Sequence, residues 1–69
     1  MERIDARGLS CPQPVVLAKN TIDKIASGEF EIIVDTGTVR DNISRLAENF
    51  GWTAAVRTDG EDIVLTLKK

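Results

Sequence analysis

The stretch that most constrains the fold runs from Asp5 to Pro14 and reads Asp-Ala-Arg-Gly-Leu-Ser-Cys-Pro-Gln-Pro. It contains the only cysteine of the 69-residue chain, Cys11, and both of its prolines. A helix tolerates proline in its first turn, because the first four N–H groups there have no intrahelical partner. The fixed φ of proline also suits that turn. We therefore predict that a helix begins at about Pro12.

This helix start would place Cys11 at the N-cap or at the first helical position. The positive end of the helix dipole favours a thiolate over a thiol, and Arg7 would add a second positive charge near the sulfur. Gln13 offers a backbone and a side-chain donor close by. Val16 and Leu17 lie one turn away, outside the apolar stripe of the helix, and either pack against a loop or form an apolar docking rim. A single cysteine is also commonly a buried, inert hydrophobe, so the residues alone leave a reactive and a structural Cys11 open.

Composition predicts one small domain over residues 1–69, with no signal peptide and a cytoplasmic location. Hydrophobic residues make up 42% of the chain, which is ordinary for a globular protein, and no apolar run is long enough to span a bilayer. One cysteine and no histidine exclude a conventional zinc site, a Cys–His pair and an internal dithiol cycle. We expect no metal and no cofactor. The net charge of −2 argues against direct binding to nucleic acid, and we expect a monomer that does not bind membranes.

Hydrophobic periodicity predicts six elements in the order β-α-β-α-β-β. The expected strands cover residues 2–6, 30–35, 52–58 and 61–68, and the expected helices cover residues 12–27 and about 38–50. Thr38 followed three residues later by Asp41 resembles a capping box for the second helix. The dipeptide Asp59-Gly60 is a strong signal for a two-residue hairpin turn between the last two strands.

Each predicted helix has one apolar stripe, and the strands have one strongly apolar face. The fold class that fits is α+β: a two-layer α/β sandwich with a four-stranded mixed sheet and both helices on one face. The first three strands would run parallel through right-handed crossovers, and the last would run antiparallel through its hairpin. The second sheet face is mixed and would be solvated or would contact a partner. It holds Glu31, Ile33, Thr53, Ala55, Arg57, Val64 and Thr66.

The carboxyl ends of the three parallel strands would meet at one edge of the sheet, where open α/β sheets place their sites. This edge would bring together the turn before Cys11, the segment Asp35-Thr36-Gly37-Thr38 and the Asp59-Gly60 hairpin. An anionic sulfur would find free N–H groups and favourable helix dipoles there. Asp35, Thr36 and Thr38 are therefore candidate neighbours of the site.

The charges at this edge allow two interpretations. Asp35 and Asp59 would oppose a thiolate if they came close to it, and their simpler interpretation is a helix-start acid and a turn former. Arg7, Lys19 and Arg40 are candidates to balance the negative charge, or are simply solvated side chains.

The pattern Asp5-x-x-Gly8-Leu9-x-Cys11-Pro12-x-Pro14-Val15 resembles the signature of the TusA/SirA family of small sulfur carriers, whose Cys-Pro-x-Pro motif opens the first helix. The length and the βαβαββ order also fit, and the resemblance covers essentially the whole chain. Within the family, the chain is most similar to the N-terminal domain of YedF-type proteins, which are associated with selenium metabolism. That similarity lies in Val34-Asp35, Asn42-Ile43 and Ala47-Glu48-Asn49.

The resemblance implies that Cys11 accepts sulfane sulfur as a persulfide from a cysteine desulfurase or another donor. Cys11 would pass this sulfur to a downstream acceptor protein by thiol exchange, as a sulfurtransferase-type carrier in sulfur or selenium metabolism. Supporting roles are implied for the motif prolines Pro12 and Pro14, for the turn glycine Gly8 and for the first-strand acid Asp5. The alternative is a protein-binding or regulatory module in which Cys11 is structural.

The chain departs from the family pattern in two ways. Better-known sulfur-relay members have Asp-Asp-Pro after the second strand, where this chain has Asp35-Thr36-Gly37, so the partners of the thiouridine-forming relay are not implied. YedF-type proteins carry a second, DsrE-like domain, which is absent from these residues. The chain would then be an excised module or a free-standing relative, with a DsrE-like domain as a candidate partner.

Overall fold

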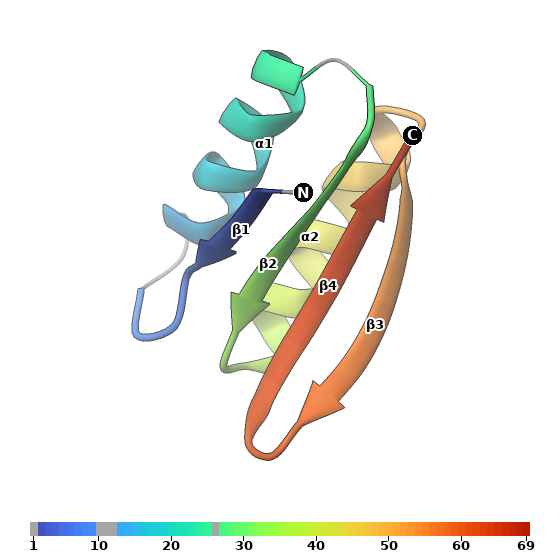
Figure 1. The fold of residues 1–69 in the computed structure, drawn as a ribbon. Helices are drawn as coiled ribbons and strands as arrows, with labels where there is room; N and C mark the ends of the chain where they lie inside the picture. The colour runs from blue at the N-terminus through green and yellow to red at the C-terminus, as the bar shows by residue number, and fades with distance from the viewer. Residues whose placement is uncertain (1, 10–12, 26) are drawn as a thin grey trace.

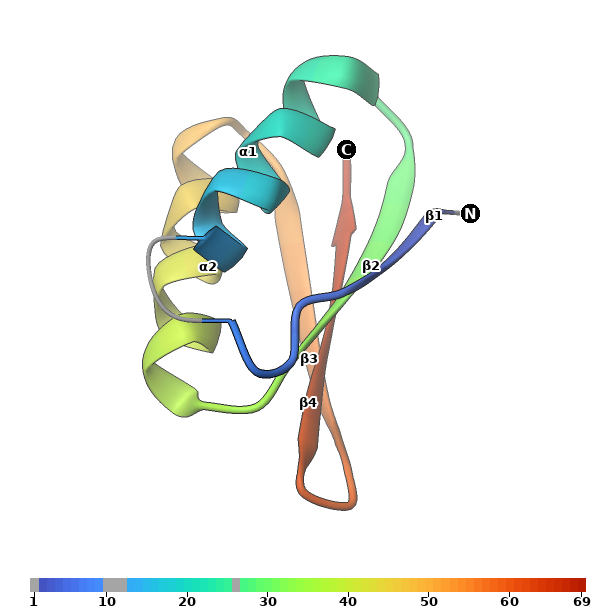
Figure 2. The same cartoon turned by 90° about the vertical axis from the view of Figure 1, so that its left-hand side faces the viewer.

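The computed structural model describes residues 2–9, 13–25 and 27–69, and its elements follow the predicted order. The strands and helices are β1 (Glu2–Asp5), α1 (Gln13–Ile25), β2 (Glu29–Val34), α2 (Gly37–Asn49), β3 (Thr53–Asp59) and β4 (Asp62–Lys68). Figure 1 shows the sheet in front of both helices, and Figure 2 shows the two layers from the side. The predicted α+β sandwich is confirmed. Neither described helix is long and apolar enough to cross a membrane.

The strand order of the sheet is β1-β2-β4-β3. β1 pairs with β2 in parallel, and β4 pairs antiparallel with both β2 and β3. β1, β2 and β3 consequently run in one direction and β4 runs against them, as predicted, while β4 lies between β2 and β3 (Figure 1). The carboxyl ends of β1, β2 and β3 therefore share one side of the sheet, which we call the carboxyl edge.

One apolar core fills the space between the sheet and the helices. In β2, the alternating side chains Phe30, Ile32 and Val34 are almost fully buried, as expected for one face of a strand. Ile43 of α2 is fully buried in the same core. The rings of Phe30 and Trp52 pack edge to face, with centroids 5.6 Å apart. The apolar faces predicted from the strand and helix periodicities thus pack together in one core.

The second helix begins at a different residue from the one predicted. Thr36 has extended backbone angles and its Oγ1 accepts a hydrogen bond from the Val39 N–H at 3.3 Å, so Thr36 is the N-cap of α2. The predicted capping box at Thr38 is wrong, because Thr38 already lies inside the helix. The first helix is described from Gln13, and Pro14 in its first turn is buried.

Other boundaries also shift by one or two residues; Ser27, predicted to end the first helix, lies outside α1. Asp59 pairs with Asp62, so Gly60 and Glu61 form the hairpin loop instead of Asp59-Gly60. Gly60 has a φ of +65°, and glycine adopts this conformation without strain at the first loop position as readily as at the second. Phe50, expected in the apolar stripe of α2, is instead its C-cap residue and is 39% exposed.

The sheet face opposite the helices carries the predicted mixture of polar and apolar residues. Glu31 is only 8% exposed there. Its carboxylate lies between the guanidinium groups of Arg3 (3.6 Å) and Arg57 (3.4 Å), which reach it from the two edge strands. Val64, which pairs with Arg57, is 1% exposed on the same face. Long arginine side chains cover apolar surface with their aliphatic stems while their charged ends stay in water. The stem of Arg57 can cover Val64 in this way.

Candidate functional site

The sequence motif with Cys11 connects the end of β1 to the start of α1. Cys11 and Pro12 lie outside the described residues, so the reactivity of Cys11 and the helix positions of both residues stay predictions. The structure describes the chain on either side, up to Leu9 and again from Gln13. These flanking residues and their contacts at the carboxyl edge define the site.

The chain leaves β1 through a tight turn from Ala6 to Leu9. The Leu9 N–H donates to the Ala6 carbonyl oxygen at 3.4 Å. Gly8, the third residue of this turn, has a φ of +77°. A type II turn requires positive φ at that position, and glycine supplies it without strain. Gly8 therefore lies in the turn that leads toward Cys11.

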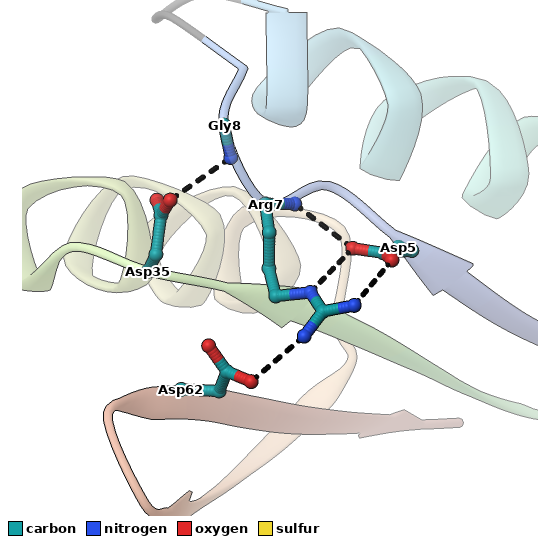
Figure 3. Close-up of polar contacts among 5 residues, drawn as sticks. All are labelled: Asp5, Arg7, Gly8, Asp35 and Asp62. Atoms are coloured by element: carbon teal, nitrogen blue, oxygen red, sulfur yellow. Dashed lines mark hydrogen bonds and ion pairs between the residues drawn. The ribbon is translucent and has the colours of Figure 1, made fainter.

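Arg7 links the exit of β1 to the beginning of β4 (Figure 3). Its Nε and Nη2 donate to the two carboxylate oxygens of Asp5 at 2.9 and 2.8 Å, and its backbone N–H donates to the same carboxylate at 3.1 Å. Its Nη1 donates to Asp62 Oδ2 at 3.0 Å. A guanidinium favours such two-pronged contact with a carboxylate. All three side chains remain partly exposed, so water screens their mutual attraction.

These contacts shift the pKa values of the two partners in opposite directions, and both shifts favour the charged forms. Hydrogen bonds from the side chain and then the backbone of Arg7 lower the pKa of Asp5 from 3.8 to about 2. Hydrogen bonds to Asp5 and then to Asp62 raise the pKa of Arg7 above its usual range. Figure 3 shows the guanidinium directed toward these two carboxylates. The described contacts therefore make Arg7 a link between strands. Its predicted charge near the sulfur of Cys11 stays a prediction, because Cys11 lies outside the described residues.

Asp35, at the end of β2, contacts the same turn. Its Oδ2 accepts a hydrogen bond from the Gly8 N–H at 2.9 Å (Figure 3). The simpler of the two interpretations of Asp35, a helix-start acid, does not describe its contact, since Thr36 supplies the side-chain cap of α2. The carboxylate instead holds a residue 27 positions earlier in the chain, which sequence spacing could not indicate.

The other candidates have no described bond to Asp35 or Gly8. Asp59 is the last residue of β3 and lines a hollow of about 420 Å³ on the open sheet face, which it shares with Asp5, Arg7 and Asp62. Lys19 pairs with Asp23 at 3.0 Å on α1, and Arg40 pairs with its neighbour Asp41 at 3.0 Å. The described ion pairs of Lys19 and Arg40 are thus local and do not reach Asp35 or Asp59.

Sequence reasoning missed Asp62. It is the first residue of β4, and its carboxylate lies beside Arg7, which is 55 positions away in the sequence. No local pattern marks this residue. Only the hairpin register, which pairs Asp62 with Asp59 at the carboxyl edge, could have suggested its place.

An apolar hollow of about 300 Å³ lies beside the start of α1 and is lined by Leu9, Gln13, Val16 and Leu17. Leu17 packs against the core, whereas Val16 is 48% exposed. Leu17 therefore packs against the core, whereas Val16 lies at the surface, where the interpretation as part of a docking rim stays a prediction. Within the described part of the chain, no group of three or more histidine, cysteine or acidic side chains could hold a metal ion.

The comparison with protein-family models matches residues 2–69 to the family described as Sulfurtransferase TusA. The chain belongs to the TusA family. A crystal structure of a SirA-like protein from Desulfitobacterium hafniense matches this TusA-family chain with a TM-score of 0.92 and 32% identity. That match covers 99% of this chain and 96% of the other.

Two archaeal relatives agree with this assignment. A candidate sulfur carrier protein of Methanocaldococcus jannaschii is 34% identical over 62 residues, which cover 88% of this chain and 83% of the relative. A candidate sulfur carrier protein of Halobacterium salinarum is 34% identical over 64 residues, which cover 90% and 79%. The resemblance to the TusA/SirA family is thus confirmed, while the closer likeness to YedF-type proteins stays a prediction.

Proposed function

We propose that this TusA-family protein is a sulfur carrier that accepts sulfane sulfur as a persulfide on Cys11 and relays it to an acceptor protein. The observation that carries the proposal is that Cys11 is the only thiol in a chain that matches the family from residue 2 to residue 69. A persulfide carrier needs a thiolate, and this chain has no second cysteine to supply one. The names of the two archaeal relatives support the same role.

The proposed reaction is thiol exchange on a persulfide. The Cys11 thiolate attacks the outer sulfur of a donor persulfide, R–S–SH, and forms a new S–S bond. The S–S bond of the donor breaks, and its inner sulfur leaves as the thiolate R–S⁻. Cys11 then holds –S–SH, and an acceptor thiolate takes the outer sulfur by the same displacement. No net oxidation occurs, so the chain needs no cofactor for either step.

The flanking residues support this chemistry. The described part of α1 starts at Gln13 and has no acidic residue in its first turn, so the positive end of its dipole is not offset there. Buried Pro14 anchors this helix start against the protein interior. On the other side, Asp5 and Arg7 hold the turn containing Gly8. We propose supporting roles for these residues, and for Pro12, in presenting an ionised Cys11.

Intact-mass measurement tests the proposal. The protein is incubated with a cysteine desulfurase and L-cysteine, and in parallel with inorganic polysulfide. We expect a gain of one sulfur atom that a reductant removes and that Cys11→Ser does not acquire. If the folded wild-type protein gains no sulfur from either donor but still binds a partner, the alternative of a non-catalytic binding module is correct.

Separate experiments are needed to identify the partner proteins and to show whether Cys11 carries sulfur or selenium. Trapping the loaded protein through Cys11 as a mixed disulfide, followed by identification of the captured protein, tests for a desulfurase, a downstream acceptor or a DsrE-like domain. Replacing the sulfur donor with selenide tests whether the same thiol handles selenium. A cytoplasmic location and a monomeric state stay predictions that fractionation and light scattering would check.

A further inference from the structure

The backbone pairing between β1 and β2 ends where the chain turns toward Cys11. Asp5 is in register with Ile33, and just beyond β1 the Ala6 N–H donates to the Ile33 carbonyl oxygen at 2.9 Å. Donors on one strand of a parallel ladder recur every second residue. The next rung would therefore join the Gly8 N–H to the backbone carbonyl of Asp35. Gly8 lies in the turn that leaves the sheet, so the two backbones diverge at this point.

The side chain of Asp35 takes the place of that rung. Its Oδ2 accepts the Gly8 N–H at 2.9 Å, and Figure 3 shows the carboxylate reaching from the end of β2 to the turn. A carboxylate acceptor makes this a charge-assisted hydrogen bond, which is stronger than a neutral one. The side-chain cap of α2 comes from Thr36. The described hydrogen bond of the Asp35 carboxylate is the one to Gly8.

We propose that Asp35 is a positioning residue for sulfur transfer, which holds, through Gly8, the turn that presents Cys11. This inference rests on the proposed carrier function. Cys11 follows Gly8 by three residues, so the chain limits the separation of their Cα atoms to about 11 Å. On the far side, the chain is held at Gln13 and at buried Pro14. Gly8 and Gln13 are thus the described ends between which the chain that bears the thiol runs.

The proposed role differs from a contribution to global stability. The Asp35–Gly8 hydrogen bond is exposed, so water can satisfy the Gly8 N–H when the carboxylate is removed. The hollow around this contact is lined by further charged groups from two places: Asp5 and Arg7 at the exit of β1, and Glu61 and Asp62 at the β3–β4 hairpin. A test must separate the hydrogen bond of Asp35 from its charge.

Two substitutions make that separation, because we expect only one of them to raise the pKa of Cys11. Asp35→Asn removes the charge but keeps an acceptor oxygen for Gly8, and removing a nearby negative charge leaves the pKa of the thiol unchanged or lowers it. Asp35→Ala removes both the charge and the acceptor. If the turn is then released from the helix start, the pKa of Cys11 rises toward the value of a free thiol, about 8.5.

The measurement is the rate of Cys11 alkylation by iodoacetamide as a function of pH. We expect Asp35→Ala to react several-fold more slowly than wild type at neutral pH, and Asp35→Asn to react at the wild-type rate or faster. Asp59→Ala is the matched control, because Asp59 lies at the same edge but has no described bond to the turn. Equal effects of the alanine and asparagine substitutions, or an Asp59→Ala effect as large as that of Asp35→Ala, would overturn the proposal.

Amide hydrogen exchange at Gly8 gives a second readout that does not depend on thiol chemistry. Exchange should be slower in wild type and Asp35→Asn than in Asp35→Ala, and equal rates would contradict the proposed hydrogen bond. Sulfur uptake from polysulfide distinguishes the two levels of failure. Absence of uptake in wild type rejects the carrier function and with it this role. Normal uptake with no difference between the Asp35 variants rejects only the role of Asp35.

Discussion

The apolar layer between the sheet and the helices differs from the polar network at the carboxyl edge in how each is held together. The layer consists of almost fully buried side chains such as Ile43 and Leu65, and burying one such side chain stabilises the fold by about 1.5–3 kcal/mol. The edge network consists of Asp5, Arg7, Gly8, Asp35 and Asp62, whose polar contacts are exposed. Water screens exposed ion pairs such as these, so each contributes little to stability. The layer therefore maintains the fold, whereas the network holds the described turn from Ala6 to Leu9 at the carboxyl edge.

The strongest test of this contrast is a cavity in the layer. Ile43→Ala should lower the free energy of unfolding by about 2–5 kcal/mol, because a fully buried side chain loses both its burial and its packing. Urea denaturation measures the loss. Val56→Ala is the control, since Val56 is 46% exposed and should change stability much less. Similar losses for the two variants would contradict the described core.

The start of α2 offers a test of intermediate size. Thr36→Ala should cost about 1 kcal/mol of stability by removing the cap of the Val39 N–H. It should leave the alkylation rate of Cys11 unchanged, because that cap belongs to the other helix. Thr38→Ala is the matched control, as Thr38 lies exposed inside α2 and alanine suits a helix better. If Thr38→Ala is the destabilising variant, the capping assignment is wrong.

The open sheet face should respond more weakly than the core. Arg57→Ala removes an ion pair to Glu31 and uncovers Val64, and we expect a loss of up to about 1 kcal/mol. Part of that loss should persist at high salt, because covering apolar surface is not screened as charge is. Arg45→Ala, at an exposed position of α2, serves as the control. If high salt abolishes the whole stability loss of Arg57→Ala, the stem of Arg57 does not stabilise the fold by covering Val64.

The smallest expected effect comes from Asp5, and its pH dependence lies in the acid range. Its folded-state pKa of about 2 lies below the ordinary value of 3.8, so its stabilising contribution is present above about pH 4. The contribution is lost as the pH falls through the folded-state value, because the unfolded chain then binds the proton more readily. Between pH 4 and pH 2, the stability of Asp5→Asn should therefore decline less steeply than that of wild type.

A control for the acid experiment is Asp23→Asn, since Asp23 pairs only locally with Lys19 on α1. Comparison with this second aspartate substitution shows whether the change in slope belongs to Asp5. If the stability of Asp5→Asn parallels that of wild type between pH 4 and pH 2, the link from Arg7 to Asp5 does not form in solution.

Local patterns predicted the elements well and their junctions less well. The alternation of Phe30, Ile32 and Val34 correctly indicated the buried face of a strand. The wrong cap at Thr38 and the hairpin loop placed one residue early have a common cause. Each boundary allowed two placements one or two residues apart, and the observed one is defined by the hydrogen bond to Val39 and by the strand register.

The sequence by itself determined the α+β sandwich, the directions of its strands and the single thiol on which any sulfur chemistry must depend. These features follow from hydrophobic period, turn residues and composition, all of which act over a few neighbouring residues. The tertiary structure alone decided that β4 enters between β2 and β3, that Arg7 meets Asp62 and that Asp35 holds Gly8. Such contacts join residues 27 and 55 positions apart, and their geometry exists only once the order of the strands brings the carboxyl edge together.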